Sequence, residues 1–344
     1  MRRILFFLTV CTLILPPAKS RGQQNSSYDL DRYIENPSMY NENQEAPHVP
    51  LCPFEKEENA LKGDFSLSPW YQSLNGTWKF SWYANPFDAP SRFYDPSTLI
   101  NTWDNIIVPG TWQMQDYGYK IYRNIPLEFA PYDPPKVPDH LNPTGLYVKE
   151  FQIPVEWDNR KIFIHFEGVK SAYWIWINGI YVGFDKGSMT SGEWDLTPYL
   201  HTGTNRIAVK VLRWCDGSYL EDQDMWRLSG IHREVLLLAQ PKVALNDFFV
   251  RTSFDDDLQD AMLQIRPRMS VGGLKELKGW KLAAQLYDAD GGPVLAAPAS
   301  IPVVKIVSES YPQRDNVKFG LLEAVVSKPR KWSAEQPYLY TLVF

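Results

Sequence analysis

The segment KIFIHFEGVKSAYWIWINGIYVGF, residues 161–184, decides the fold. Its first part places Ile162, Ile164 and Phe166 at every second position, which is the period of a β-strand that turns one face toward a core. The next part, SAYWIWIN, alternates in the same way. The pair Asn178–Gly179 is typical of a two-residue hairpin turn, so the segment predicts a series of short antiparallel strands.

The same alternation recurs on both sides of this segment, without helical stretches between the strands. It is found in residues 77–83, 205–214 and 232–239. The chain also contains 27 prolines, and proline breaks the interior of a helix. Short strands at this spacing indicate an all-β chain whose first domain, residues 47–241, is a two-sheet sandwich of the jelly-roll type.

A second series of strands begins after Pro241. We expect strands near residues 244–253, 260–268, 279–288 and 317–326, with a last strand at residues 338–344. A series of roughly 100 residues with this pattern matches an immunoglobulin-like sandwich, which we assign to residues 242–344. Because the sequence stops inside the last predicted strand, without a polar tail, we expect the chain to be a truncated piece.

The first 20 residues have the composition of a secretory signal peptide. Arg2 and Arg3 precede an apolar run, Ile4–Leu15, and Ala18–Ser20 is a small-x-small cleavage site. The run is too short to cross a bilayer. The sequence therefore predicts an exported protein, periplasmic or extracellular, with no membrane span.

Residues 21–46 are polar and rich in turn formers, and we predict a flexible linker there. Cys11 follows Val10, which makes a poor lipoprotein signal. After cleavage only Cys52 and Cys215 remain. An oxidising compartment would allow them to pair, but two free buried thiols are the favoured interpretation.

Composition excludes some partners and leaves others open. The formal net charge is −5 and no basic stripe exists, so nucleic acid is not expected as a partner. The five histidines stand at no metal-ligand spacing, which argues against a zinc site. Aromatic residues make up 14% of the chain, which suits sugar binding, although core packing is the commoner use.

Polar side chains gather in two predicted loops, residues 112–126 and 213–227. The second carries Asp216, Glu221, Asp222 and Asp224 among aromatic residues. Carboxylates and amides beside aromatic rings suit a neutral sugar, and carboxylates with loop carbonyls suit a hard cation. For a loop of unknown origin, a solvated acidic turn is the commoner interpretation.

Six segments resemble the N-terminal part of the family 2 β-galactosidases among the glycoside hydrolases. They are SLNGTWKFSW (73–82), VPGTWQMQDYG (108–118), IYRNIPLEF (121–129), NPTGLYVKEF (142–151), SYLEDQDMWRLSGIHREV (218–235) and WSAEQPYLYTL (332–342). The resemblance implies a sugar-binding jelly roll followed by an immunoglobulin-like domain. The family's TIM barrel, which carries both catalytic glutamates and the Mg²⁺ ligands, has no counterpart in residues 1–344.

The resemblance also assigns roles to single residues. It implies that Asn124 and Asp224 contact the galactosyl group, that Asp224 is also a ligand of a Na⁺ ion, and that Asp222 and Trp226 shape the loop. No catalytic residue is expected in this chain, which alone should be inactive. The implied partners are galactoside glycans, and a separate catalytic barrel chain or a homo-oligomer. The alternative function is a non-catalytic carbohydrate-binding protein, or a complementation partner of that separate catalytic chain.

Overall fold

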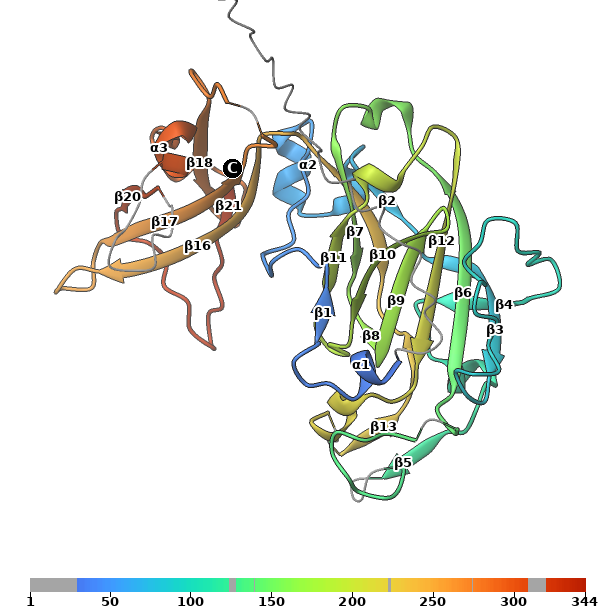
Figure 1. Ribbon diagram of the computed structural model, residues 1–344. Helices are drawn as coiled ribbons and strands as arrows, with labels where there is room; N and C mark the ends of the chain where they lie inside the picture. The colour runs from blue at the N-terminus through green and yellow to red at the C-terminus, as the bar shows by residue number, and fades with distance from the viewer. Residues whose placement is uncertain (1–29, 124–127, 139, 222–223, 274, 309–319) are drawn as a thin grey trace, which may run out of the picture.

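The computed structural model describes residues 30–123, 128–138, 140–221, 224–273, 275–308 and 320–344. Figure 1 shows two β-rich bodies, one built from β1 to β15 and the other from β16 to β21. The prediction of an all-β chain with two successive sandwiches is confirmed. Its helices are short: α1 (Leu30–Ile34), α2 (Glu57–Lys62), α3 (Val303–Ser308), and the 3₁₀ turns η1 (Phe65–Leu67), η2 (Trp112–Gln115), η3 (Val155–Trp157), η4 (Thr197–Tyr199) and η5 (Asp216–Tyr219).

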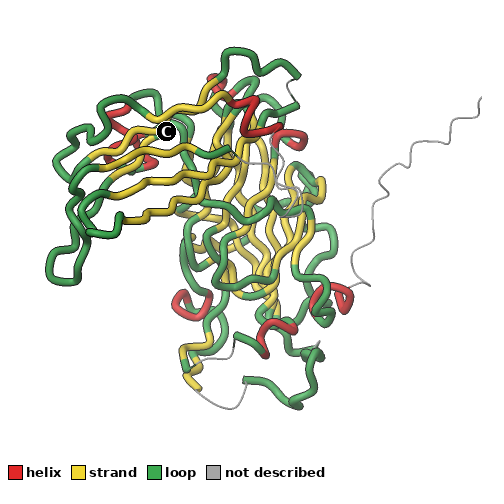
Figure 2. The backbone as a smooth tube through the Cα atoms, turned by 90° about the vertical axis from the view of Figure 1, so that its left-hand side faces the viewer, coloured by secondary structure: helices red, strands yellow, loops and turns green. Residues whose placement is uncertain are grey.

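The first body consists of two large antiparallel sheets and two two-stranded ladders, one formed by β5 (Ile121–Arg123) and β13 (Met225–Arg227), the other by β8 (Val169–Lys170) and β14 (Gly230–Ile231). In spatial order the larger sheet contains β1 (Asn41–Glu42), β10 (Ile180–Asp185), β9 (Ala172–Ile177), β12 (Thr204–Leu212), β6 (Thr144–Gln152), β3 (Gly76–Tyr83) and β4 (Asp104–Val108). The smaller sheet contains β11 (Gly192–Asp195), β7 (Lys161–Phe166), β15 (Val235–Gln240) and β2 (Tyr71–Ser73). Sequential hairpins and long crossovers together produce the layered arrangement seen in Figure 2.

The core between these sheets is formed by the predicted alternating residues. Ile164 and Phe166 of β7 face Tyr173, Ile175 and Ile177 of β9 in one buried cluster. The opposite face of β9 is buried as well, because Trp174 and Trp176 pack under α1 and the segments that follow β3 and β5. The period-two pattern therefore predicts the strand correctly, while both of its faces lie in apolar cores.

The prediction of a flexible linker is wrong for residues 30–46, which we call the N-terminal segment. Ile34 is only 2% exposed, and β1 pairs with β10 as the edge strand of the larger sheet. The indole of Trp194 donates to the backbone carbonyl of Glu42 at 3.0 Å. Both hydrogen bonds and apolar packing hold this segment, since Leu30, Tyr33, Ile34 and Met39 lie in or against an apolar core, and its mostly polar composition did not reveal these few contacts.

The second body is a smaller sandwich of two three-stranded sheets. One contains β16 (Ala244–Phe254), β17 (Ala261–Ser270) and β20 (Leu322–Val326), and the other β19 (Ala299–Pro302), β18 (Lys281–Tyr287) and β21 (Thr341–Val343). Leu263, Ile265 and Leu286 lie in its core. The last strand is shorter than predicted, and Phe344 packs on Phe248 with ring centroids 4.8 Å apart.

The buried carboxylate of Glu193 in β11 contacts two histidines, His165 of β7 and His48 of the segment that precedes β2. Nε2 of His48 lies 2.9 Å from Glu193 Oε1, and Nδ1 of His165 lies 3.2 Å from Oε2. The hydrogen bond to the Glu193 carboxylate raises the pKa of His48 to about 9, against the opposing effect of burial. Burial also disfavours the charge on Glu193, but the two histidines hold its pKa below the ordinary value.

The His48 contact predicts a stability that depends on pH. Because the folded-state pKa of His48 is raised, its contribution is fully present below the unfolded pKa of about 6.5 and is lost as pH rises through about 9. We expect His48→Gln to cost about 1 kcal/mol at pH 6, after allowance for solvent screening, and almost nothing at pH 10. Urea unfolding at both pH values measures this difference. If the cost of His48→Gln were the same at both pH values, or persisted in a Glu193→Gln background, the assignment would be wrong.

Candidate functional site

The two polar loops predicted from the sequence lie side by side. β5 (Ile121–Arg123) pairs antiparallel with β13 (Met225–Arg227), and Tyr122 stands opposite Trp226 in this ladder. Figure 1 shows the pair at one end of the first sandwich, away from the second body. The pairing therefore brings together two segments about 100 positions apart in sequence.

Asp224 lies at the start of this small ladder with an exposed side chain. The hydroxyl of Tyr122 donates to Asp224 Oδ1, and this hydrogen bond to a carboxylate raises the pKa of Tyr122. The rings of Tyr122 and Trp226 are 5.7 Å apart and tilted by 53°, and about half of each side chain is exposed. One carboxylate flanked by two half-exposed aromatic rings is a suitable surface for a neutral sugar.

The other predicted contact residue, Asn124, lies outside the described residues, and so does Asp222. Asn124 is the residue directly after β5 in the sequence, as Asp224 is the residue directly before β13. The roles assigned to Asn124 and Asp224 stay predictions. Trp226, which was assigned to loop structure only, is half-exposed next to Asp224.

Residues 213–221 and 224–227, which we call the site loop, begin on a buried ion pair. Arg213 Nη2 lies 2.6 Å from Glu128 Oε2, with both side chains less than a tenth exposed. The indole of Trp214 donates to Glu128 Oε1 at 2.5 Å, and Arg213 donates to the carbonyl of Arg227 at 3.1 Å. These bonds join the beginning and the end of the site loop to the segment that follows β5.

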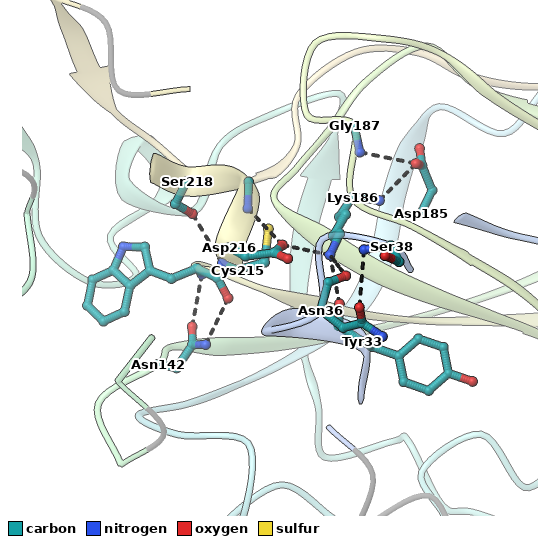
Figure 3. A network of polar contacts seen from close by, with 12 residues as sticks. Tyr33, Asn36, Ser38, Asn142, Asp185, Lys186, Gly187, Cys215, Asp216 and Ser218 are labelled. Carbon is teal, nitrogen blue, oxygen red and sulfur yellow. Dashed lines mark hydrogen bonds and ion pairs between the residues drawn. The ribbon is translucent and has the colours of Figure 1, made fainter. Parts of the chain in front are cut away.

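Two of the acidic candidates are used for structure. Asp216 is 7% exposed, and its Oδ1 lies 2.6 Å from the ammonium group of Lys186. Glu221 accepts from the backbone N–H of Ser188 at 3.0 Å and from its hydroxyl at 2.5 Å. Both carboxylates are therefore bonded to residues that directly follow β10, and Figure 3 shows Asp216 directed at Lys186.

The cysteines are not paired. Cys52 and Cys215 are both free, as predicted, but only Cys215 is buried as expected, whereas Cys52 is half-buried. Cys215 is fully buried next to Asp216, and this burial raises the pKa of its thiol to about 11. The thiol is therefore neutral at physiological pH and acts as a small packing group at the base of the site loop.

A cavity of about 1130 Å³ lies between the N-terminal segment and the site loop. It is bounded by Tyr40, Met189, Asp216 and Glu221, among others. Asp224 lies on the exposed surface and does not line the cavity. This cavity is thus not the place where the sequence predicts sugar contacts, and the Asp224 cluster has the shape of one open wall.

Neither a metal-binding cluster nor a membrane-spanning helix occurs in the part of the chain that the structure describes. No group of three or more His, Cys, Asp and Glu side chains lies there in an arrangement that holds a metal ion. A hard cation takes six or more oxygen ligands in many proteins, so Asp224 fits only as one ligand of a site completed by other groups. No helix among the described residues is long and apolar enough to cross a bilayer.

Sequence reasoning missed Lys186 and Glu128, which hold the site loop. For Lys186 the sequence did contain a signal, which is a charged residue close after the apolar strand that ends near Phe184. No local signal exists for Glu128, because its partners lie 85 and 86 positions further along the chain.

Comparison with protein-family models gives two adjoining matches. Residues 71–241 match the model described as "Glycosyl hydrolases family 2, sugar binding domain". Residues 243–344 match the model described as "Glycosyl hydrolases family 2". Together the two matches span almost the whole of both sandwiches.

Curated relatives and solved structures agree with these matches. A protein named Beta-galactosidase from Priestia megaterium is 39% identical over 311 residues, which are 90% of this chain and 29% of that protein. Its namesake from Vibrio cholerae is 38% identical over 314 residues, 91% of this chain and 30% of its own length. The chain thus spans less than a third of the relatives it matches.

Among solved structures, a beta-glycosidase from Bacteroides vulgatus aligns with a TM-score of 0.58 and 25% identity, over 79% of this chain and 31% of its own. A beta-glucuronidase from Bacteroides uniformis aligns with a TM-score of 0.57 and 23% identity, over 79% of this chain and 29% of its own. The second likeness shows the fold alone.

Proposed function

Because the chain belongs to family 2 of the glycosyl hydrolases and comprises its sugar-binding and following domains, we propose that it is the N-terminal part of an exported β-galactosidase. In this role it contributes one wall of the sugar site, while the reaction takes place on a catalytic barrel. The similarity of 38–39% to proteins named Beta-galactosidase over nine tenths of the chain favours this substrate class.

The observation that carries the proposal is the exposed cluster of Asp224, Tyr122 and Trp226 on paired strands. A carboxylate accepts hydrogen bonds from sugar hydroxyls, and such charge-assisted bonds are stronger than neutral ones. The aromatic faces provide apolar area for the C–H face of a sugar ring. Since nothing in the described residues closes over the cluster, we expect it to bind a galactosyl group weakly until a second wall covers it.

The chemistry of the site loop explains why the chain alone should not catalyse hydrolysis. A retaining glycosidase needs two carboxyl groups about 5 Å apart, one as nucleophile and one as acid and base. Asp224 is bonded to a tyrosine hydroxyl, while Asp216 and Glu221 are bound to Lys186 and Ser188. No pair of free carboxylates therefore faces a common space among the described residues of this loop.

The remaining parts of the proposal rest on the sequence. The composition of residues 1–20 supports export to the periplasm or the medium. Asp224 would serve as one oxygen ligand of a Na⁺ ion, completed by groups outside the cluster. The partners of the chain would be a galactoside glycan and either a separate catalytic barrel chain or further copies of itself.

Replacing Asp224 with alanine tests the proposal. We expect the wild-type chain to bind methyl β-galactoside with a Kd weaker than millimolar, as measured by saturation-transfer NMR, and not to hydrolyse nitrophenyl β-galactoside above a blank. Loss of a hydrogen bond to a charged group costs about 1.5–3 kcal/mol, so Asp224→Ala should abolish the detectable transfer.

The matched control for this experiment is Asp256→Ala, an exposed carboxylate of the second sandwich, which should leave the transfer unchanged. Hydrolysis by the wild-type chain, or full transfer in Asp224→Ala, would contradict the proposal. Micromolar affinity that depends on Asp224 would instead favour a free-standing carbohydrate-binding protein.

A further inference from the structure

Lys186 is a buried lysine that the proposed chemistry does not use. It follows β10 directly and is only 7% exposed. Its ammonium group carries three protons and has three acceptors: Asp216 Oδ1 at 2.6 Å, the carbonyl of Tyr33 at 2.9 Å and the carbonyl of Asn36 at 3.0 Å. Figure 3 shows these acceptors converging on the group.

The three acceptors come from two parts of the chain that are far apart in sequence. Tyr33 and Asn36 belong to the N-terminal segment, and Asp216 begins η5 in the site loop. Among the described residues, the second oxygen of Asp216 has no hydrogen-bond partner, and besides Lys186 its Oδ1 accepts from the adjacent N–H of Gly217 at 2.8 Å. The buried charge of Asp216 thus depends on Lys186, because a charge in a buried place needs a partner.

The same connection holds the site loop at a second point. Two residues after Lys186, Ser188 binds both oxygens of Glu221. Between these anchors the backbone forms a tight unit, in which the N–H groups of Leu220 and Glu221 both donate to the carbonyl of Gly217 at 2.9 and 3.0 Å. Asp224 lies three residues beyond this unit in the sequence.

We propose that Lys186 is a positioning residue of the sugar site: its ammonium group fastens the N-terminal segment to the site loop, so that both are ordered together and Asp224 is held in place. The link to sugar binding rests on the proposed function, whereas the link between the two segments does not. The N-terminal segment is, on this view, a structural element of the binding site although it does not contact the sugar.

The experiment compares Lys186→Met with the wild-type chain by hydrogen exchange and by sugar affinity. Methionine keeps the length of the side chain and removes its charge and its donors. We expect amide exchange to rise at least tenfold in both residues 30–46 and residues 213–221, because both lose one anchor. Saturation transfer from the protein to methyl β-galactoside should fall at least threefold at a temperature where circular dichroism shows the chain folded, which a role in global stability alone would not produce.

Lys149→Met is the matched control, since the Lys149 ammonium group also donates to two backbone carbonyls of the same sandwich, those of Asn75 at 3.3 Å and Thr77 at 3.0 Å, outside both segments. It should change neither exchange in the two segments nor affinity. If Lys186→Met does not fold, Lys186→Gln, which keeps two donors without the charge, is measured instead, and Asp216→Asn should shift exchange in the same direction.

Two results would overturn the inference. One is faster exchange in residues 30–46 with unchanged exchange in residues 213–221, and the other is faster exchange in both with unchanged affinity. Absence of sugar transfer in the wild-type chain would count against the proposed function instead, and the joint rise in exchange would still decide whether Lys186 links the two segments.

Discussion

Replacing Trp112 with alanine is expected to lower the free energy of unfolding of the first sandwich by about 3–5 kcal/mol, the range for a buried aromatic residue cut to alanine. Trp112 is completely buried in the core between the sheets. Its indole donates to the hydroxyl of Tyr147. A Cβ at Gly145 would lie 2.6 Å from its ring, which shows how closely strand β6 approaches the ring.

The substitution removes both the packing and the partner of a buried hydroxyl. The backbone N–H of Trp112, which the substitution keeps, donates to the carbonyl of Ser229, two residues after the site loop, at 2.9 Å. Urea unfolding followed by far-UV circular dichroism measures the loss. Met114→Ala, on the same 3₁₀ turn but 64% exposed, is the control and should stay within about 0.5 kcal/mol of the wild type. A loss below about 1.5 kcal/mol for Trp112→Ala would mean that this core is not packed as described.

Replacing Glu128 with alanine is expected to cost a similar amount, about 3–5 kcal/mol, because it leaves Arg213 charged and buried without its carboxylate. The indole of Trp214 loses its acceptor at the same time. Glu150→Ala is the matched control: its ion pair with Arg206 is 2.8 Å long, but the Glu150 side chain is 53% exposed. Such an exposed pair contributes about 1 kcal/mol or less, so Glu150→Ala should lower the free energy of unfolding by no more than that.

A second variant separates the buried charge from the other effects of Glu128→Ala. In the double variant Glu128→Ala/Arg213→Met the unpaired charge is gone, and we expect the double variant to be more stable than Glu128→Ala alone. Urea unfolding of the wild type, Glu128→Ala, Arg213→Met and the double variant gives the four free energies of a double-mutant cycle. A double variant less stable than Glu128→Ala would show that the packing of Arg213, rather than its unpaired charge, controls the base of the site loop.

The strands were predictable because their information is local. In β7 and β9 the side chains alternate between the two faces of the strand. Asn178–Gly179 forms the hairpin turn between β9 and β10 because of its own backbone preferences, independently of the rest of the fold. That both faces of β9 are buried was not predictable, since the cover over Trp174 and Trp176 comes from distant segments. The N-terminal segment was misjudged for a related reason, because its anchors are the buried ammonium group of Lys186 and the edge of β10.

The candidate site was predictable only in part. Composition marked the acidic loop, but a list of acids does not distinguish Asp224, which is exposed beside two rings, from Asp216, which neutralises a buried lysine. The difference between them depends on which segments the fold places next to each acid. Resemblance to a family was needed to single out Asp224, and the structure then showed Tyr122 and Trp226 beside it.

The central claim is that a galactosyl group binds at the exposed cluster on β5 and β13 and not in the large cavity beside the N-terminal segment. Titration of the ¹⁵N-labelled chain with methyl β-galactoside, followed by the indole resonance of Trp226 and the amides of residues 121–123 and 224–227, tests it directly. The account predicts shifts at these positions that disappear in Asp224→Ala. Shifts confined to residues that line the cavity, such as Tyr40 and Met189, or no shift at Trp226 at saturating sugar, would contradict it.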